Sequence, residues 1–223
     1  MNFLEIIPEN SLIKCTNPIE TVILNDPISS QPLSKDKQLS DTGNMVGNNE
    51  SINEMPLDIS YLLSVSVAES VTAGALSNTL CSEPGSSRFF LGGIVAYNRE
   101  TQQNLLNIKF GQDEIKNFAN PFTTFIMAKN VTDIFKSRIG ISTTGYSLPL
   151  LFKDGVEIDV NIPYSCFCLY DSKTGYNKLY KYIHTNYDPN GNQKVQRAQH
   201  QSKIAIECKK IFYEYCLKIN KYK

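Results

Sequence analysis

From Leu57 onward, short apolar runs alternate along the chain with longer stretches of helical periodicity. The runs that predict strands lie at Leu62–Val67, Gly92–Tyr97, Ile139–Thr144, Tyr164–Tyr170 and Leu179–Thr185. Helices are predicted directly after the first run, near Gln102–Leu106, from Asn120 to Phe135 and over the C-terminal segment. Strands that alternate with helices predict an α/β domain whose layers pack around one sheet.

Capping and turn residues mark where these elements begin and end. Asn120 is a preferred helix-capping residue, and Pro121 after it suits the first helical turn. Turns are predicted at Pro84–Ser87, Lys173–Gly175 and Asp188–Asn192. The C-terminal helix carries apolar side chains at the i, i+4, i+7, i+8 and i+11 spacing of one buried face: Ile204, Cys208, Ile211, Phe212 and Tyr215.

The N-terminal part of the chain has a different pattern. From Asn25 to Met55 the sequence is rich in Ser, Asn, Asp, Gln and Pro, with too few apolar residues to offset the entropy lost on ordering. Two short apolar clusters, Phe3–Ile7 and Thr21–Leu24, could add a strand, bind a partner or belong to an unstructured tail. We therefore expect a largely disordered, acidic segment over residues 1–56 and a folded domain over 57–219.

The charges are unevenly distributed. The chain of 223 residues has 22 basic and 22 acidic side chains, enough length for one sizeable domain. Residues 1–60 carry a net charge of −6, residues 61–172 of −2 and residues 173–223 of +8. This distribution argues against a uniformly basic nucleic-acid-binding protein. It suggests instead that the acidic segment screens, or docks on, the basic C-terminal face.

Several features bear on the cellular compartment. No run approaches the eighteen consecutive apolar residues of a membrane-spanning helix, and the first residues lack the pattern of a secretory signal. Six cysteines in such a chain indicate reduced thiols rather than a disulfide framework. We therefore expect an intracellular, cytoplasmic protein without a membrane partner.

The segment Ser66–Gly74 (SVAESVTAG) holds the most informative chemistry. A strand that ends in Ala68-Glu69-Ser70 and runs into a helix puts the Ser70 hydroxyl among unpaired N–H groups at the positive end of the helix dipole. Such groups can hold an anion, or an oxyanion formed when a serine attacks a carbonyl. Serine before a helix is more commonly a cap, and the Gly-x-Ser-x-Gly elbow of hydrolases is missing. The segment alone leaves both interpretations open.

Taken together, four segments resemble the C-terminal domain of the CinA (competence/damage-inducible) family. They are AESVTAG from Ala68, PGSSRFFLGGIVAYNRETQQNLL from Pro84, NPFTTFIMAKNV from Asn120 and IGISTTG from Ile139. Members of this family carry Ala-Glu-Ser-x-Thr-Gly-Gly and then Pro-Gly-Ser-Ser-x-x-Phe-x-Gly-Gly-x-Val-x-Tyr, in this order and at this spacing. The resemblance extends roughly from Leu57 to Cys216 and is strongest over residues 66–108.

The resemblance implies a three-layer αβα domain, commonly a homo-oligomer, with nicotinamide-nucleotide amidase activity. That reaction hydrolyses the carboxamide of nicotinamide mononucleotide, a linear amide, and releases ammonia without a cofactor or a metal. Matched residue by residue, Ser70 would be the nucleophile, Thr72 and Gly74 would supply hydrogen-bond donors, and Tyr97 would lie in the pocket. Glu69 would support the turn through hydrogen bonds. The other matched positions, expected to bind substrate, are Ser86, Ser87, Arg99, Gln102, Thr144 and Gly145.

Three departures from the family pattern oppose catalysis. Gln102 stands where the family has a lysine, and an amide cannot accept the serine proton as a lysine of lowered pKa can. Arg99 stays protonated, so it could bind phosphate without acting as a base. Ala73 replaces one glycine of Thr-Gly-Gly, and Tyr146–Pro149 replaces a glycine-rich loop after Gly145. Two functions therefore remain: a serine amidohydrolase, or a catalytically impaired homologue that binds a small ligand or a protein.

Weaker constellations complete the sequence picture. Cys166 and Cys168 with His184 could bind zinc, but buried structural thiols fit alternate strand positions better. Either His184 or His200 could act as a base for Ser70. Arg197 is the nearest candidate for an arginine that the family places early in its last helix. Tyrosines interleaved with lysines could stack on nucleic acid, although a strand face with solvated lysines explains them as well: Tyr176, Lys178, Tyr180, Lys181, Tyr182 and Tyr187.

Overall fold

The computed structural model describes residues 21–25, 59–110, 119–153 and 156–221, and six of its strands form one sheet in the order β1-β8-β7-β4-β2-β3. The strands are β1 (Thr21–Asn25), β2 (Val65–Glu69), β3 (Phe90–Val95), β4 (Ile139–Tyr146), β7 (Tyr164–Asp171) and β8 (Asn177–Ile183). β2 is parallel to β3 and β4, and β1 is parallel to β8. β7 is antiparallel to β4 and β8, so the sheet is mixed.

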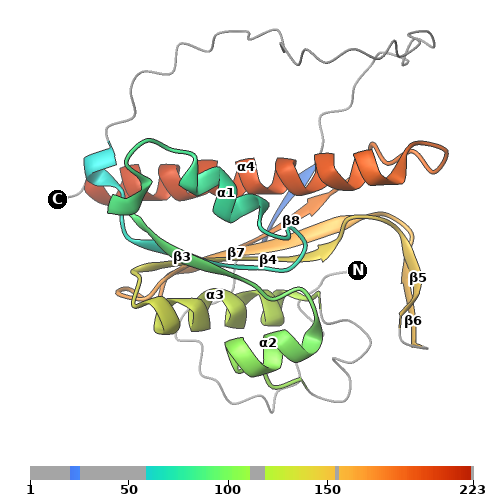
Figure 1. The fold of residues 1–223 in the computed structure, drawn as a ribbon, viewed down its shortest axis with the longest axis horizontal. Coiled ribbons are helices and arrows are strands. Elements are labelled where there is room, and N and C mark those ends of the chain that lie inside the picture. The colour runs from blue at the N-terminus through green and yellow to red at the C-terminus, as the bar shows by residue number, and fades with distance from the viewer. Residues whose placement is uncertain (1–20, 26–58, 111–118, 154–155, 222–223) are drawn as a thin grey trace, which may run out of the picture.

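Helices cover both faces of this sheet and make the three layers that the sequence predicts. Figure 1 shows α1 and α4 on one face and α2 and α3 on the other. The helices are α1 (Ala75–Cys81), α2 (Arg99–Leu106), α3 (Pro121–Phe135) and α4 (Gln193–Asn220), with short 3-10 turns at Ile59–Tyr61 and Ser86–Arg88. A separate two-stranded hairpin, β5 (Leu150–Lys153) and β6 (Val156–Val160), lies to one side.

Each face of the sheet has its own apolar core. On the α4 side, Val65, Val67 and Phe167 pack with Ile204 and with the rest of the predicted helical stripe, of which Cys208 and Phe212 are buried. On the α3 side, strand residues such as Ala68 and Cys168 pack against buried residues of that helix. Because strand side chains alternate between faces, β2 sends Val67 to one core and Ala68 to the other.

Capping explains why α3 begins where the sequence predicts. The Asn120 side chain accepts a hydrogen bond from the Thr123 N–H at 2.8 Å, and Pro121 occupies the first turn. This satisfies one of the N–H groups that a helix start leaves without an intrahelical partner.

Some boundaries differ from the sequence prediction. β2 covers Val65–Glu69 instead of Leu62–Val67, because its pairing with β3 and β4 continues as far as Glu69. The helix that follows starts only at Ala75. Of the options open for Thr21–Leu24, the structure shows the added strand, β1. The cluster Phe3–Ile7 and residues 26–55 of the predicted linker lie outside the described residues.

The cysteines of β7 serve the core. Cys166 and Cys168 are buried, and burial raises the pKa of the Cys166 thiol to about 12. Cys168 packs on the α3 side, whereas His184 contacts His200 of α4 on the other side. Within the described residues no group of three or more His, Cys, Asp or Glu side chains could hold a metal ion. The zinc constellation suggested by the sequence is therefore not assembled.

Two tyrosines of the C-terminal cluster use their ring faces within the domain. Tyr180 stacks on Phe167 with ring centroids 4.9 Å apart, and Tyr176 stacks on Tyr215 at 5.1 Å. Lys178 lies over the Tyr180 ring, with its ammonium 5.8 Å from the centroid. These contacts fit the interpretation as a strand face with solvated lysines better than a platform for nucleic-acid bases.

Candidate active site

Glu69 organises the turn between β2 and α1. Its buried carboxylate accepts five hydrogen bonds: from the N–H groups of Gly74, Leu76 and Ser77 and from the hydroxyls of Thr72 and Ser77, at 2.6–3.0 Å. The orphan N–H groups at the start of α1 are thereby satisfied from within the chain. Glu69 therefore supports the turn through hydrogen bonds, as the sequence suggests. The Gly74 N–H, expected to donate to substrate, donates to Glu69 instead.

The Thr72 side chain belongs to the same network. Its hydroxyl donates to Glu69 Oε2 at 2.7 Å and lies 2.6 Å from the Thr143 hydroxyl. Because a hydroxyl has one proton, Thr143 must be the donor in that second bond. The Thr72 hydroxyl therefore has no proton left to donate to a ligand, and the remaining donor of this residue is its backbone N–H.

Backbone conformation in this turn explains the small residues after Thr72. Ala73 has φ 51° and Gly74 has φ 100°, so both occupy the left-handed region. From the sequence we predict that alanine in place of glycine at position 73 is unfavourable if φ is positive there. The structure shows that φ is positive. Alanine adopts this conformation with strain of about 1 kcal/mol.

Ser70 lies on the opposite face of the sheet from the Glu69 carboxylate. Ser66 donates to the Val131 carbonyl of α3 and Ala68 packs against α3, so strand alternation puts Ser70 on the α3 face as well. Its N–H donates to the Thr143 carbonyl at 2.8 Å, which extends the pairing of β2 with β4 by one residue. Ser70 is 5% exposed, and its hydroxyl forms no hydrogen bond with the described residues.

Two further polar side chains of this face are buried without a full set of partners. Ser142 donates to the Thr124 carbonyl of α3, so Thr144, two residues on, also faces α3, and its buried hydroxyl has no partner in the described residues. Gln102 of α2 is fully buried; its Nε2 donates to the Ala96 carbonyl at 3.0 Å, whereas its Oε1 has no partner.

Ser70, Thr144 and Gln102 are brought together by strand pairing. Glu69 pairs with Val95 and with Thr143, so Ser70 lies between Ala96 and Thr144, the next residues of β3 and β4. Neighbouring strands are about 4.8 Å apart, and Gln102 is bonded to Ala96 itself. Buried polar atoms without partners are uncommon in folded proteins, so this row of groups is the candidate ligand site.

Tyr97 and Arg197 meet on the α4 side of the sheet, just beyond the end of β3. Tyr97 follows β3 and is 51% exposed, and the Arg197 guanidinium of α4 donates a hydrogen bond to its hydroxyl. One turn further along α4, Gln201 Nε2 donates to the Val71 carbonyl at 3.1 Å. The N-terminal half of α4 therefore forms a wall beside the turn that carries Ser70.

Comparison with known proteins identifies the domain. The family model described as the CinA C-terminal domain matches residues 57–155, which include Ser70, Tyr97, Gln102 and Thr144. Residues 57–155 of this chain are therefore similar in sequence to the CinA C-terminal domain.

The relatives agree with this assignment. Protein MG115 of Mycoplasma genitalium is 39% identical over 83 residues, which are 37% of this chain and 53% of that protein. A putative competence-damage inducible protein of Streptococcus gordonii is 31% identical over 129 residues, which are 57% of this chain and 31% of that protein. The chain thus matches about half of the first relative and under a third of the second.

Solved structures show the same fold. The competence damage-inducible protein A of Klebsiella pneumoniae aligns with a TM-score of 0.52 at 17% identity, over 72% of this chain and 89% of that chain. A competence or damage-inducible protein of Enterobacter asburiae aligns with a TM-score of 0.52 at 23% identity, over 67% and 87%. The α/β fold of this chain is therefore the fold of these two structures.

Not every matched residue of the CinA domain lies near Ser70. Ser86 and Ser87 precede β3, whereas Tyr97 follows it, so about 20 Å of strand separates them from the Tyr97 end. The Ser86 hydroxyl donates to the Cys81 carbonyl at the end of α1. The structure does not bring these two serines to Ser70.

Arg99 and Gly145 have structural contacts of their own. The Arg99 guanidinium lies 4.7 Å from the centre of the Phe110 ring. Gly145 has φ 145°, and a Cβ there would lie 2.3 Å from the Tyr164 carbonyl oxygen of the neighbouring strand. The glycine is required by the close pairing of β4 with β7, which accounts for it without a ligand.

The two histidines meet at a different serine. His200 Nε2 lies 2.6 Å from the hydroxyl of Ser165, and the rings of His184 and His200 are in contact. Burial, together with the neighbouring His184, lowers the pKa of His200 to about 2, so its imidazole is neutral. Ser165 is fully buried in β7. His200 and Ser165 join α4 to the sheet, a pairing that residue spacing alone cannot predict.

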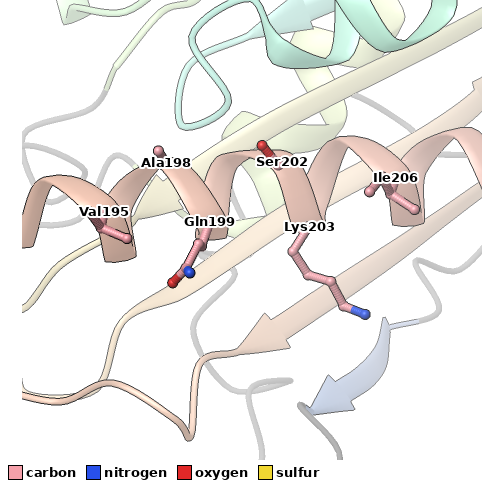
Figure 2. A pocket seen from close by; sticks show the side chains of 6 residues that line it. All are labelled: Val195, Ala198, Gln199, Ser202, Lys203 and Ile206. Atoms are coloured by element: carbon pink, nitrogen blue, oxygen red, sulfur yellow. The ribbon is translucent and has the colours of Figure 1, made fainter. Parts of the chain in front are cut away.

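A surface hollow lies along α4, and Ser70 is not among the residues that line it. It has a volume of about 510 Å³ and is lined by one side of α4 alone: Val195, Ala198, Gln199, Ser202, Lys203 and Ile206 (Figure 2). Its polar side chains, Gln199, Ser202 and Lys203, all come from this one helix, and the Ser70 row remains the candidate site. Within the described residues, no helix combines the length and apolar character needed to cross a membrane.

Proposed function

We propose that this CinA domain binds a nicotinamide-type nucleotide at Ser70 and has lost efficient hydrolysis of its carboxamide. The proposal depends most on the burial and hydrogen bonding of Gln102. Its side chain is fully buried beside the strand end, and its Nε2 donates a hydrogen bond to the Ala96 carbonyl. The resemblance to the CinA family puts a lysine at this position, and glutamine cannot take the proton from Ser70.

Neither the two histidines nor the two arginines named above replace that base. His200 is bonded to Ser165 and His184 lies against His200, so neither imidazole is committed to Ser70. An arginine guanidinium does not act as a base in proteins, so neither Arg99 nor Arg197 can take this role. Nucleophilic attack by a neutral serine hydroxyl without a base is slow, because general-base assistance typically contributes 10²–10⁴-fold.

The groups needed for binding are retained. The Ser70 hydroxyl is unpaired in the described residues, and the Thr144 hydroxyl and Gln102 Oε1 next to it are buried without partners. A carboxamide has both a donor and an acceptor to offer to these groups. Arg197, held at Tyr97, supplies a guanidinium suited to a phosphate. A ligand with a planar carboxamide group at one end and a phosphate at the other matches this set.

The second candidate function is the amidase itself. It is favoured by the unpaired Ser70 hydroxyl beside the N–H groups of Val71 and Thr72, which donate no hydrogen bond within the described residues. Two N–H donors next to a serine are the parts of an oxyanion hole. On this alternative the reaction releases ammonia from nicotinamide mononucleotide and depends on Ser70.

The test combines calorimetry with ammonia release, using nicotinamide mononucleotide and the full chain. Wild type, Ser70→Ala and Gln102→Lys are compared with Gln103→Lys, which adds the same charge at the exposed neighbouring position. Binding by wild type without turnover, with turnover gained only in Gln102→Lys, supports the proposal. Turnover by wild type that Ser70→Ala abolishes supports the amidase. Absence of binding in wild type overturns both and leaves a protein-interaction module.

A further inference from the structure

Gln201 of α4 reaches the turn that carries Ser70, 130 residues earlier in the chain. Its Nε2 donates to the Val71 carbonyl oxygen at 3.1 Å, and the side chain is partly buried. The residue is absent from the family motifs, and nothing in its sequence context distinguishes it from Gln199 or Gln196. The contact is made by folding alone.

The bond fixes the orientation of one peptide group. The Val71 carbonyl and the Thr72 N–H belong to the same planar trans peptide, so they point in opposite directions. Gln201 holds the carbonyl toward the α4 layer. The Thr72 N–H is therefore directed away from α4, to the side of the sheet on which Ser70 and Thr144 lie.

Most other N–H groups of this turn are already used. Ser70 N–H donates to the Thr143 carbonyl at 2.8 Å, Ala73 N–H to the Ser70 carbonyl at 3.3 Å and Gly74 N–H to Glu69 at 2.9 Å. Val71 and Thr72 are the residues of the turn whose N–H groups make no bond within the described residues. Of these two, Thr72 has its peptide plane held by a side chain from another layer.

Contacts on either side of Gln201 hold α4 in register with the turn. Arg197, one turn earlier, donates to the Tyr97 hydroxyl. His200, the preceding residue, is bonded to the buried Ser165 hydroxyl at 2.6 Å. The Gln201 amide is therefore placed by two contacts that are independent of the turn, as a residue that orients another group must be.

We infer that Gln201 is a positioning residue: through the Val71–Thr72 peptide it aims the Thr72 N–H at the carbonyl oxygen of a ligand bound at Ser70. This inference rests on the proposed function, because the ligand oxygen is that of the carboxamide. Gln201 does not touch the ligand. Without it, the peptide is free to rotate, and a rotated peptide presents a carbonyl oxygen to the ligand where the N–H was.

The first experiment measures affinity for two ligands by calorimetry. These are nicotinamide mononucleotide and the pyridine mononucleotide that lacks the carboxamide but keeps ribose and phosphate. Gln201→Leu is compared with Gln199→Leu, the same change on the outer side of α4. We expect Gln201→Leu to weaken binding of the carboxamide ligand about fivefold or more, the value of one lost hydrogen bond, and to leave the other ligand unchanged. Equal loss for both ligands, or no loss, overturns the inference.

A second probe separates this inference from the identity of the ligand. Phenylboronic acid adds to a serine: the Ser70 oxygen forms a bond to boron, its proton goes to solvent, and the negative charge stays on the tetrahedral boronate, whose oxygens accept N–H donors. If wild type forms this adduct, Ser70→Ala does not, and Gln201→Leu weakens it relative to Gln199→Leu, the positioning role stands even where nicotinamide mononucleotide fails to bind. Equal boronate affinity in Gln201→Leu and wild type, or no adduct in wild type, overturns it.

Discussion

At the carboxyl end of β2, the two faces of the sheet treat their polar groups in opposite ways. On the α1 side, the Glu69 carboxylate accepts five hydrogen bonds and Thr72 is bonded to both Glu69 and Thr143. On the α3 side, the buried Thr144 hydroxyl and Gln102 Oε1 have no partner in the described residues, and neither does the Ser70 hydroxyl. A paired network stabilises a fold, whereas unpaired buried groups cost free energy unless a ligand meets them. One face is therefore built for structure and the other for binding.

The largest expected effect comes from removing the centre of the paired side. Glu69→Ala leaves three N–H groups of the turn, one buried and two partly buried, without an acceptor, and we expect the free energy of unfolding to fall by about 3–5 kcal/mol. Urea denaturation measures it. Glu214→Ala, at an exposed position of α4, is the control and should change the free energy by less than about 0.5 kcal/mol. Similar losses in the two variants would show that the network does not hold the turn.

The next effect concerns the helix that carries Gln201, and it depends on pH. The pKa of His200 is lowered to about 2 in the folded protein by burial and by His184, whereas an unfolded histidine titrates near 6.5. Below pH 6.5 the unfolded state therefore binds more protons than the folded state. The contribution of neutral His200 to the free energy of unfolding is present above pH 6.5 and is lost as the pH falls. Between pH 7 and pH 5 the free energy of unfolding should drop by about 2 kcal/mol.

Urea denaturation at pH 7 and pH 5 measures this drop in the free energy of unfolding, in wild type and in His200→Gln. The glutamine keeps a polar group for Ser165 but cannot titrate, so most of the pH dependence should disappear. A variant as pH-dependent as wild type would assign the effect to other groups.

A matched pair of substitutions compares the two faces directly. Thr72 and Thr144 are both almost fully buried, and valine has nearly the shape of threonine. Thr72→Val removes a donor to Glu69 and should cost about 1–2 kcal/mol. Thr144→Val removes a buried hydroxyl without a partner in the described residues, so we expect no loss, or a gain of up to about 1 kcal/mol. If thermal denaturation shows Thr144→Val to be less stable than Thr72→Val, the two faces do not differ as described.

The smallest expected effect is a gain in stability at Ala73. Its φ of 51° suits glycine better than alanine, but glycine also loses more entropy on folding. The net result for Ala73→Gly should be a stabilisation of about 0.5 kcal/mol. Ala75→Gly, at the first residue of α1, should instead cost about 0.5–1 kcal/mol. Differential scanning calorimetry should therefore move the two melting temperatures in opposite directions.

The local parts of this fold could be predicted because nearby residues decide them. Asn120-Pro121 starts α3 where the cap and the proline indicate, and the apolar stripe of the last helix is buried as its spacing requires. The turn after β2 was recognisable from Ser70 and Glu69, and the CinA family from the segments around them. The pairing of β1 with β8 could not be predicted, since more than 150 residues separate the two strands.

For the candidate site, sequence and tertiary structure made different contributions. The chemical groups could be identified from the residues alone: a serine at a strand end, a glutamine in place of a lysine, and a glutamate in the turn. Which of these groups meet depends on the packing of the layers. The tertiary structure committed Gly74 to Glu69, joined His200 to Ser165 instead of Ser70, and brought Gln201 to Val71. The physical reason is that side-chain types are fixed locally, whereas hydrogen bonds between layers depend on how α4 packs across the sheet.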